Sequence, residues 1–521
     1  MSFAPLSCVR MNRRQLLSGA AAVGALTLAG RAVGRAQESV QGRPLLTVES
    51  TTLEVNGKAA KAYVVKGPAG EGIFAREGER LSGAVLNASD APLQLHWHGQ
   101  IFAPPEQDRA RPNGGTLASG QTDLVDYRLT PGTHWMHAHT LTEQQLLAAP
   151  LVTREADAGE VQDVVVMLHD FAFRTPQEIL AELGGTDGHG GGHGGMGHAM
   201  GTQGLVPQGM GAQGMGPQGM GAQGMGGGHA GHGMSMGAMM GGTRGMAGGG
   251  MGGMAHANDV AYDAYLANRR TLADPEVVQV ERGAPVRLRV INGGTATAFF
   301  LSLPGLAPRC IAVDGVACVP VAAGVFPLAQ GQRIDLLVDL PQAGGAFPLL
   351  AQVEGARART GIVLATPGAS IARIPEVAEQ AEGLLDLAFE STLAARAPLM
   401  ARRPDRVFPV MLGEEPGYRW TINGRIHGED VPFEVRQGER VEMTFMNPTM
   451  MSHPMHIHGH HFQVVALGPQ RFSGALRDTV IVPPHMPVTI AFDAGQKGEW
   501  FLHCHHLYHM AGGMMTSVRV V

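Results

Sequence analysis

The stretch HCHHLYHMAGGMM, from His503 to Met515, decides how the rest of the chain is interpreted. It sets one cysteine between two histidines and adds a further histidine and methionines a few residues later. These side chains are soft and borderline metal ligands. Because alternate side chains of a β-strand point to opposite faces, His503 and His505 would face one way and Cys504 the other. The stretch therefore predicts a short strand that supplies two different metal sites.

Length and composition indicate several domains rich in β-structure. A chain of 521 residues exceeds what one hydrophobic core usually organises. Only 16% of its residues are charged, and its 74 glycines and 33 prolines are typical of short strands and turns. The net charge of −6, without a basic patch, argues against a nucleic-acid-binding protein.

Three parts of the sequence have the texture of β-strands, at residues 45–175, 259–367 and 405–521. The phrases VERGAPVRLRVIN and VRQGERVEMTFMN share a glycine turn, an alternating strand and a closing asparagine. This similarity predicts an internal repeat of one Greek-key β-sandwich domain, and hence an all-β fold of three such domains. Residues 371–404 are predicted to form a linker with some helix.

The N-terminal 36 residues are predicted to be a twin-arginine export signal. Arg13 and Arg14 precede a short apolar run, and small residues around Gly34 offer a cleavage site. The run is too short and too rich in glycine to favour a membrane anchor, and no later segment is apolar enough to span a bilayer. We therefore expect a periplasmic protein.

Residues 184–258 differ from the rest of the chain because they consist mainly of glycine, methionine, histidine, alanine and glutamine. Glycine at this density predicts a disordered insert. A flexible tether would explain the glycines alone, but the 13 methionines and six histidines between residues 188 and 256 favour capture of Cu(I). Both interpretations remain open.

Four histidine-x-histidine pairs stand out: His96 with His98, His137 with His139, His456 with His458, and His503 with His505. On extended segments both members of a pair can reach the same metal cluster. Two pairs belong to the first predicted domain and two to the third, so the cluster would lie between these domains. Eight imidazoles suit three copper ions.

The opposite face of the last pair predicts a separate mononuclear site. Cys504, His453, His509 and Met514 provide the two-histidine, one-cysteine set with a weak axial methionine that holds blue copper. Cys310 and Cys318 either form a disulfide or remain buried thiols. His427 and several other histidines fit no motif.

The motifs HWHG, WMHAH, HPMHIHG and HCHHLYHMAGGM resemble those of the three-domain, cupredoxin-like multicopper oxidases, and their order is the same. The resemblance covers most of the chain outside the insert. It implies four copper ions, one of type 1, one of type 2 and two of type 3. The implied type 1 ligands are His453, Cys504, His509 and Met514, and the implied type 2 ligands are His96 and His456. The implied type 3 ligands are His98, His137, His139, His458, His503 and His505.

Two further residues receive roles from the resemblance. Asp108 stands where relatives place an acid near the cluster, and it would deliver protons; a turn aspartate is the alternative. Met451 would contact an incoming Cu(I). The copper-efflux members of the family carry acids where Thr449 and Met510 stand here, and they carry their methionine-rich insert in the third domain. Asp478 is typical of the family, and we interpret it as structural.

The predicted function is oxidation of a one-electron donor coupled to reduction of dioxygen to water, with Cys504 as the entry point for electrons. Cu(I) oxidation in copper tolerance is the favoured activity. A laccase acting on phenols or aromatic amines is the alternative. A copper-storage protein is the alternative of another class.

Overall fold

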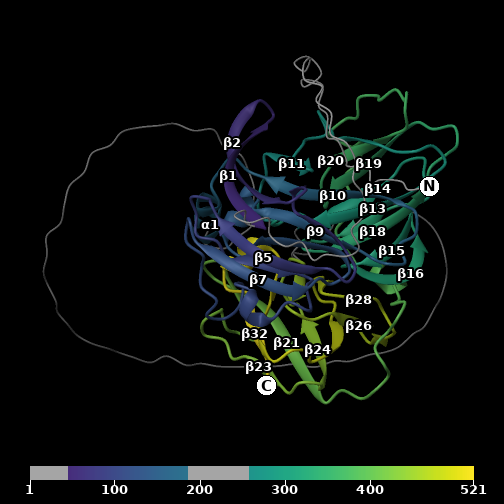
Figure 1. Cartoon of the computed structure of the whole chain (residues 1–521). Coiled ribbons are helices and arrows are strands. Elements are labelled where there is room, and N and C mark those ends of the chain that lie inside the picture. The colour runs from purple at the N-terminus through teal and green to yellow at the C-terminus, as the bar shows by residue number, and fades with distance from the viewer. Residues whose placement is uncertain (1–44, 186–256) are drawn as a thin grey trace, which may run out of the picture.

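The computed structural model describes residues 45–185 and 257–521, and six β-sheets account for most of the regular structure in them. The predicted export signal and residues 186–256 of the predicted insert lie outside these ranges. Within the described ranges, no helix has the length and hydropathy needed to cross a membrane. Figure 1 shows the chain passing from the purple N-terminal strands through the teal and green strands to the yellow C-terminal ones.

The first sandwich consists of a five-stranded sheet, ordered β3-β2-β1-β5-β7, and a four-stranded sheet, ordered β4-β9-β8-β6. Its apolar core includes Tyr63, Trp97 and Met136. The strands are β1 (Leu46–Val55), β2 (Lys58–Gly67), β3 (Gly70–Glu71), β4 (Ile73–Arg76), β5 (Arg80–Asn87), β6 (Leu95–His98), β7 (Thr122–Arg128), β8 (Gly132–Ala138) and β9 (Ala148–Arg154). Short 3₁₀ helices, η2 (Pro105–Gln107) and η3 (Leu141–Gln145), follow β6 and β8.

The second sandwich consists of a six-stranded sheet, ordered β11-β10-β13-β18-β15-β16, and a five-stranded sheet, ordered β12-β20-β19-β14-β17. Helix α1 (Pro176–Gly185) follows β10. The strands are β10 (Gln162–Phe171), β11 (Ala264–Ala267), β12 (Val277–Gln279), β13 (Pro285–Asn292), β14 (Phe299–Ser302), β15 (Arg309–Val313), β16 (Val316–Ala322), β17 (Phe326–Leu328), β18 (Arg333–Asp339), β19 (Ala346–Val353) and β20 (Arg359–Ala365).

The third sandwich pairs a sheet ordered β22-β21-β24-β30-β26-β27, with β28 on β26, against a sheet ordered β23-β32-β31-β25-β29. Helix α2 (Leu507–Ala511) connects β31 to β32. The strands are β21 (Arg406–Glu415), β22 (Arg419–Ile422), β23 (Phe433–Val435), β24 (Arg440–Met446), β25 (His453–Ile457), β26 (Phe462–Leu467), β27 (Gln470–Arg471), β28 (Leu476–Arg477), β29 (Thr479–Val482), β30 (Val488–Asp493), β31 (Gly498–Cys504) and β32 (Met515–Val520).

The three sandwiches share one pairing pattern. Each contains a parallel pair in its first sheet (β1 with β5, β10 with β13, β21 with β24) and another in its second (β4 with β9, β12 with β20, β23 with β32). Asn87, Asn292 and Asn447 follow the same pattern, because each side-chain amide donates to two backbone carbonyls, at 2.8–3.0 Å. The all-β prediction is confirmed, and the asparagine that closes each repeated phrase anchors a turn.

Some details differ from the sequence prediction. The first domain was predicted to extend to residue 175, but β10 pairs with β13 in the second sandwich, because alternation within a strand does not specify the sheet that it joins. Helix α1 was not predicted. The predicted linker 371–404 contains only the 3₁₀ helix η4 (Glu390–Thr392), because its backbone bonds to neighbouring loops and strands.

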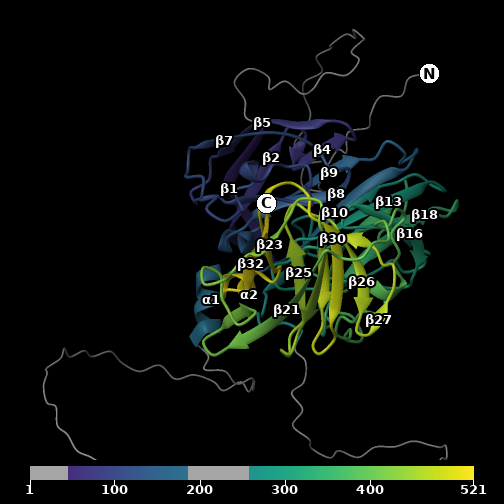
Figure 2. The ribbon, with the colours of Figure 1, turned by 90° about the horizontal axis from the view of Figure 1, so that it is seen from below.

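The first and third sandwiches lie against each other, although they stand at opposite ends of the chain (Figure 2). Helices α1 and α2 also come together, where Ile179 packs with Leu507, Tyr508 and Val260. This arrangement brings the four histidine pairs to one interface.

Candidate metal centres

The four histidine pairs lie at the ends of four strands. His96 and His98 close β6, which pairs with β8, and β8 leads into the second pair. His456 lies directly opposite His503 where β25 pairs with β31. All eight side chains are buried at the interface of the first and third sandwiches, and we call them the eight-histidine cluster.

Several imidazole nitrogens of the cluster approach one another across this interface. His96 Nε2 lies 3.3 Å from His456 Nε2. His503 Nε2 lies 3.2 Å from His139 Nε2 and 3.1 Å from His458 Nε2. Nitrogens that converge this closely on a shared point have the spacing of ligands around a metal ion.

Three rings of the cluster carry nitrogens without a hydrogen-bond partner: His98 at Nδ1, His137 at Nε2, and His505 at both Nδ1 and Nε2. Their rings lie close together, with centroids 5.6 Å apart for His98 and His137, 5.2 Å for His98 and His505, and 5.1 Å for His137 and His505. Buried polar atoms without partners are costly, and a metal ion would satisfy one nitrogen on each of the three rings. The chain therefore offers three groups of donors, as three metal ions require.

In five cluster imidazoles, Nδ1 lies within hydrogen-bond distance of a protein oxygen. This contact fixes the tautomer and directs Nε2 toward the centre of the cluster. The acceptors at Nδ1 are Asp108 Oδ2 for His96 (2.7 Å), the Asp478 carbonyl for His456 (2.8 Å), the Ala110 carbonyl for His458 (3.0 Å), the Cys504 carbonyl for His503 (2.9 Å) and Glu143 Oε2 for His137 (3.0 Å). Glu143 was not predicted from the sequence, although it follows the WMHAH motif by only four residues.

Burial favours the neutral form of an imidazole, and the neutral form is the one that binds metal. Loss of solvation lowers the pKa of His96 and His505 well below the usual histidine value, and their histidine neighbours lower it further. Burial raises the pKa of Asp108 to about 8, although the Ala110 N–H, which donates to its Oδ1 at 3.0 Å, opposes the shift. Asp108 thus lies beside the cluster as the sequence indicated.

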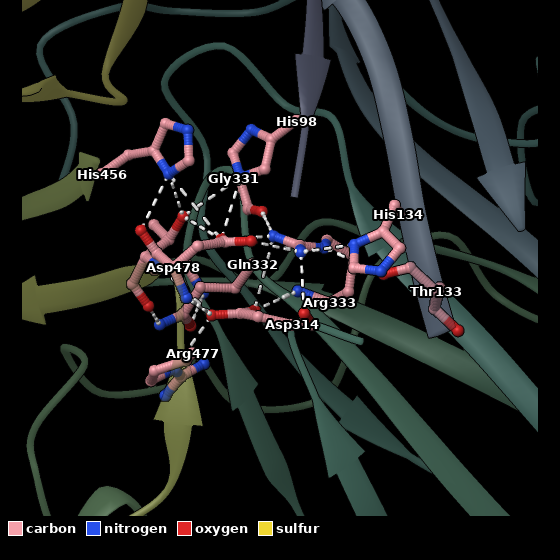
Figure 3. A network of polar contacts seen from close by, with 12 residues as sticks. His98, Thr133, His134, Asp314, Gly331, Gln332, Arg333, His456, Arg477 and Asp478 are labelled. Atoms are coloured by element: carbon pink, nitrogen blue, oxygen red, sulfur yellow. Dashed lines mark hydrogen bonds and ion pairs between the residues drawn. The ribbon is translucent and has the colours of Figure 1, made fainter. Parts of the chain in front are cut away.

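Asp478 belongs to a buried polar network under the cluster (Figure 3). Its Oδ1 lies 3.0 Å from His98 Nε2, and both carboxylate oxygens accept from the Arg333 guanidinium at 2.6 Å. Burial alone would raise the pKa of Asp478, but the Arg333 charge holds it well below its usual range. The sequence indicated a structural aspartate; the network also orients a candidate ligand, because the bond at Nε2 directs His98 Nδ1 to the cluster.

The mononuclear site forms within the third sandwich. Cys504 Sγ lies 3.7 Å from both His453 Nδ1 and His509 Nδ1, and these two nitrogens lie 3.2 Å apart. Met514 is buried in the same core, and its backbone carbonyl accepts from the Cys504 N–H at 3.1 Å. Burial raises the pKa of the Cys504 thiol, so a metal must displace a tightly held proton to bind.

Groups around the mononuclear site orient its two imidazoles. Thr449, which stands where the copper-efflux members of the family carry an acid, places its hydroxyl 2.8 Å from His453 Nε2. Asp259 lies at the other imidazole, with Oδ2 3.7 Å from His509 Nε2, and accepts from the Tyr418 hydroxyl at 2.5 Å. His506 stacks on His509, with ring centroids 3.7 Å apart.

Neither Asp259 nor His506 was predicted from the sequence to act at this site. Asp259 is the first residue of the predicted second domain, and no spacing rule connects it with the C-terminal motif. His506 directly follows the last histidine pair and belongs to none of the four pairs.

Two further predictions concern individual residues. Met451, predicted to contact Cu(I), is 8% exposed and packs in the core of the third sandwich. Cys310 and Cys318 are free thiols whose sulfur atoms lie 3.8 Å apart.

Together, the repeated β-sandwiches and the cysteine–histidine donor sets define a copper protein of the cupredoxin class. Three multicopper oxidase family profiles match residues 47–156, 220–370 and 401–521. The chain belongs to the multicopper oxidase family, as the sequence motifs indicated, and it is an oxidoreductase that uses copper.

Curated relatives extend this similarity over most of the chain. Multicopper oxidase MmcO of Mycobacterium tuberculosis is 29% identical and aligns with 86% of this chain and 80% of its own length. A copper resistance protein A homolog of Pseudomonas syringae pv. tomato is 24% identical, over 91% of this chain and 92% of its own.

Solved structures share the fold. The McoA multicopper oxidase of Aquifex aeolicus has a TM-score of 0.60 and 23% identity, over 92% of this chain and 96% of its own. The laccase of Botrytis aclada has a TM-score of 0.67 and 21% identity, over 91% of this chain and 86% of its own.

The donor sets fit copper. The mononuclear site offers a thiolate with two imidazoles and a buried methionine, whereas the cluster offers only imidazoles, several without any other partner. When bound, copper would supply one-electron chemistry at the first site and multi-electron reduction of dioxygen at the second.

Proposed function

We propose that the protein couples the oxidation of Cu(I) to the reduction of dioxygen to water, with four copper ions per chain. The type 1 ion would be held by His453, Cys504, His509 and Met514. The type 2 ion would be held by His96 and His456, and the type 3 pair by His98, His137, His139, His458, His503 and His505. Export to the periplasm, where copper is handled outside the cytoplasm, accords with the N-terminal sequence.

Residue positions along β31 support the proposed route for electrons. Cys504 lies between His503 and His505, and strand alternation directs its sulfur toward one site and the two imidazoles toward the other. An electron accepted at Cys504 therefore has a short covalent path to the cluster. Buried side chains surround both sites and exclude water from this path.

Proton delivery is assigned to Asp108. Its carboxyl lies 2.7 Å from His96 Nδ1 and 3.9 Å from His458 Nδ1, so it contacts ligands that we assign to the type 2 and type 3 ions. A buried carboxyl at this place can hold a proton beside the reacting oxygen and release it during turnover.

The choice of Cu(I) as donor is supported chiefly by the two places where the predicted methionine-rich insert, residues 184–258, joins the rest of the chain. The chain leaves the described region after α1 and re-enters it at residue 257, two residues before Asp259. Both junctions pack on α2, which carries His509. The methionine- and histidine-rich segment is thus attached to the chain beside His509, a proposed ligand of the mononuclear site. Asp259, whose carboxylate attracts cations, lies next to it.

Laccase activity is the second candidate, because the Asp259 carboxylate beside His509 could also accept the proton of a phenol. A copper-storage role is disfavoured by membership in an oxidase family.

Oxygen consumption distinguishes the donors. Copper-loaded protein is supplied with Cu(I), Fe(II) or a phenol, and compared with a variant whose residues 188–256 are replaced by a glycine–serine segment of equal length. We expect this variant to lose Cu(I) turnover at low Cu(I) concentration and to keep phenol turnover. Unchanged Cu(I) turnover would refute the capture role, and negligible oxygen consumption with every donor would refute the oxidase.

A further inference from the structure

A cavity of about 500 Å³ lies between the first and third sandwiches, and its wall includes His139 of the eight-histidine cluster. Its walls include Arg111 and His139 from the first sandwich, and His427, Met510 and Met515 from the third. The last three carry soft or borderline ligand atoms and are not among the proposed ligands of either copper centre.

Three backbone hydrogen bonds hold the backbones of His427, Met510 and Met515 around one glycine. The Gly513 carbonyl accepts from the N–H of His427 at 3.0 Å and from the N–H of Met515 at 2.7 Å. The Gly513 N–H donates to the Met510 carbonyl at 3.0 Å. Gly513 has a φ of +116°, and a Cβ here would lie 2.6 Å from Ile426 Cβ, so only glycine allows this convergence.

Two of these side chains, those of Met515 and His427, also lie on one face of the strand that carries Cys504. Met515 lies directly opposite His503 in the β31–β32 register, so both point to the face of Phe501. The His427 ring meets the Phe501 ring edge-on at 5.5 Å, and His139 stacks on Phe501 at 5.5 Å. The Phe501 ring thus contacts both His427 and a histidine of the cluster.

The local charges are compatible with a monovalent cation. His427 Nδ1 lies 3.6 Å from Asp430 Oδ1, and the His427 side chain is 41% exposed. The imidazole can therefore release Asp430 and bind a metal ion instead. The Arg111 guanidinium faces the cavity and donates to the Asp108 carbonyl. Its positive charge disfavours a divalent ion more strongly than a monovalent one.

We propose that this cavity binds Cu(I) through the thioethers of Met510 and Met515 and the imidazole of His427. The identity of the bound ion rests on the proposed function, because the site would bind the Cu(I) that donates the electron. Met510 follows His509, and Met515 follows Met514, so the bound ion lies one residue from two proposed type 1 ligands. There Cu(I) would give one electron to a copper ion held by the type 1 ligands and would leave as Cu(II), which binds thioethers poorly.

Silver provides a redox-inert probe for this site. Crystals of the copper-loaded protein soaked in Ag(I) should show an anomalous peak among Met510, Met515 and His427. The variants M510L, M515L and H427Q should each raise KM for Cu(I) about tenfold or more. M411L is the matched control, because Met411 is 40% exposed on β21 and does not line the cavity.

Phenol oxidation in the same variants serves as the internal reference. Met510 and Met515 neighbour type 1 ligands, so M510L and M515L could also affect the type 1 centre directly. H427Q changes a separate segment, and it must lower the ratio of kcat/KM for Cu(I) to kcat/KM for phenol as the other two variants do. Absence of silver from the cavity, an unchanged ratio, or a change only in KM for dioxygen would overturn the site. Silver bound as expected in a protein that does not oxidise Cu(I) would keep the site and refute the donor assignment instead.

Discussion

The mononuclear site and the eight-histidine cluster differ in the number of sandwiches that build them. All proposed ligands of the mononuclear site lie between residues 453 and 514, in the third sandwich alone. The cluster takes half of its imidazoles from the first sandwich and half from the third, and His96 and His456 are 360 positions apart in sequence. The first site therefore requires one folded domain, whereas the second requires two domains to dock correctly.

The supporting residues also differ, although Asp259, which precedes β11 of the second sandwich, reaches His509 of the mononuclear site. Thr449 orients one imidazole of the mononuclear site from within the same sandwich. The cluster is supported from the second sandwich, because Arg333 on β18 binds Asp478, which in turn binds His98 of the first sandwich. Changes in this support should therefore affect the cluster while sparing the mononuclear site.

The variant C504S should give the largest difference between the effects on the two copper centres. Serine lacks the thiolate, so the intense thiolate-to-copper absorption and donor turnover should both fall to background. The cluster should keep its three coppers, because none of its ligands changes. Copper content per chain and the visible and electron paramagnetic resonance spectra measure this. A parallel loss of cluster copper would contradict the independence of the two centres.

The reverse experiment is D478N. It leaves the buried Arg333 guanidinium with only the more distant Asp314 carboxylate, at 3.7 Å, which should lower the free energy of unfolding by roughly 3–5 kcal/mol. Loss of the His98 anchor should lower cluster copper affinity about 10–100-fold, while the mononuclear site keeps its absorption. Denaturant unfolding and chelator competition measure these effects.

D126N is the control for D478N, because Asp126 pairs with Arg80 at an exposed position, where we expect little change. Equal loss of copper from both centres in D478N would show that the network supports the whole protein and not the cluster.

Glu354, which belongs to neither copper centre, tests whether the stability of the protein can change without a change in metal binding. Burial raises the pKa of Glu354 from 4.5 to about 7, although the Leu385 N–H bonds to its carboxylate. Its contribution to stability is intact below pH 4.5 and is lost as pH rises to 7, because the folded protein then holds a proton that the unfolded chain releases. E354Q should remove this loss.

E354Q and wild type should therefore differ little at pH 4, and E354Q should be the more stable by about 3 kcal/mol at pH 8. Denaturant unfolding at both pH values measures the difference, and copper content should be equal in the two proteins. A difference in stability that does not depend on pH would contradict the assignment.

The smallest effect is expected at Glu143, since the Ala138 carbonyl also lies within 3.1 Å of His137 Nδ1. E143Q keeps an oxygen acceptor for the imidazole N–H, whereas E143L does not. Cluster copper affinity should fall about tenfold in E143L and remain near wild type in E143Q. Chelator competition measures this, with the mononuclear absorption as reference. Equal retention in the two variants would remove Glu143 from the support of the cluster.

Strand periodicity made much of both donor sets predictable from sequence. The pairs from His96 to His505 share a face because alternate residues of a strand do, whatever the fold around them. The same rule separated Cys504 from its neighbours. It did not specify which sheet β10 joins, because any exposed strand edge of matching register offers the same hydrogen bonds.

The sequence by itself therefore determined the family, the repeated β-sandwich and the proposed copper ligands, since these depend on residue type and on spacing along one strand. Only the tertiary structure decided which side chains support those ligands. Asp259, Glu143 and Arg333 reach the sites from other elements, and His427 meets Met510 and Met515 only where the chain folds back at Gly513. Contacts between distant segments depend on how the sandwiches pack, and no local pattern in the chain encodes that packing.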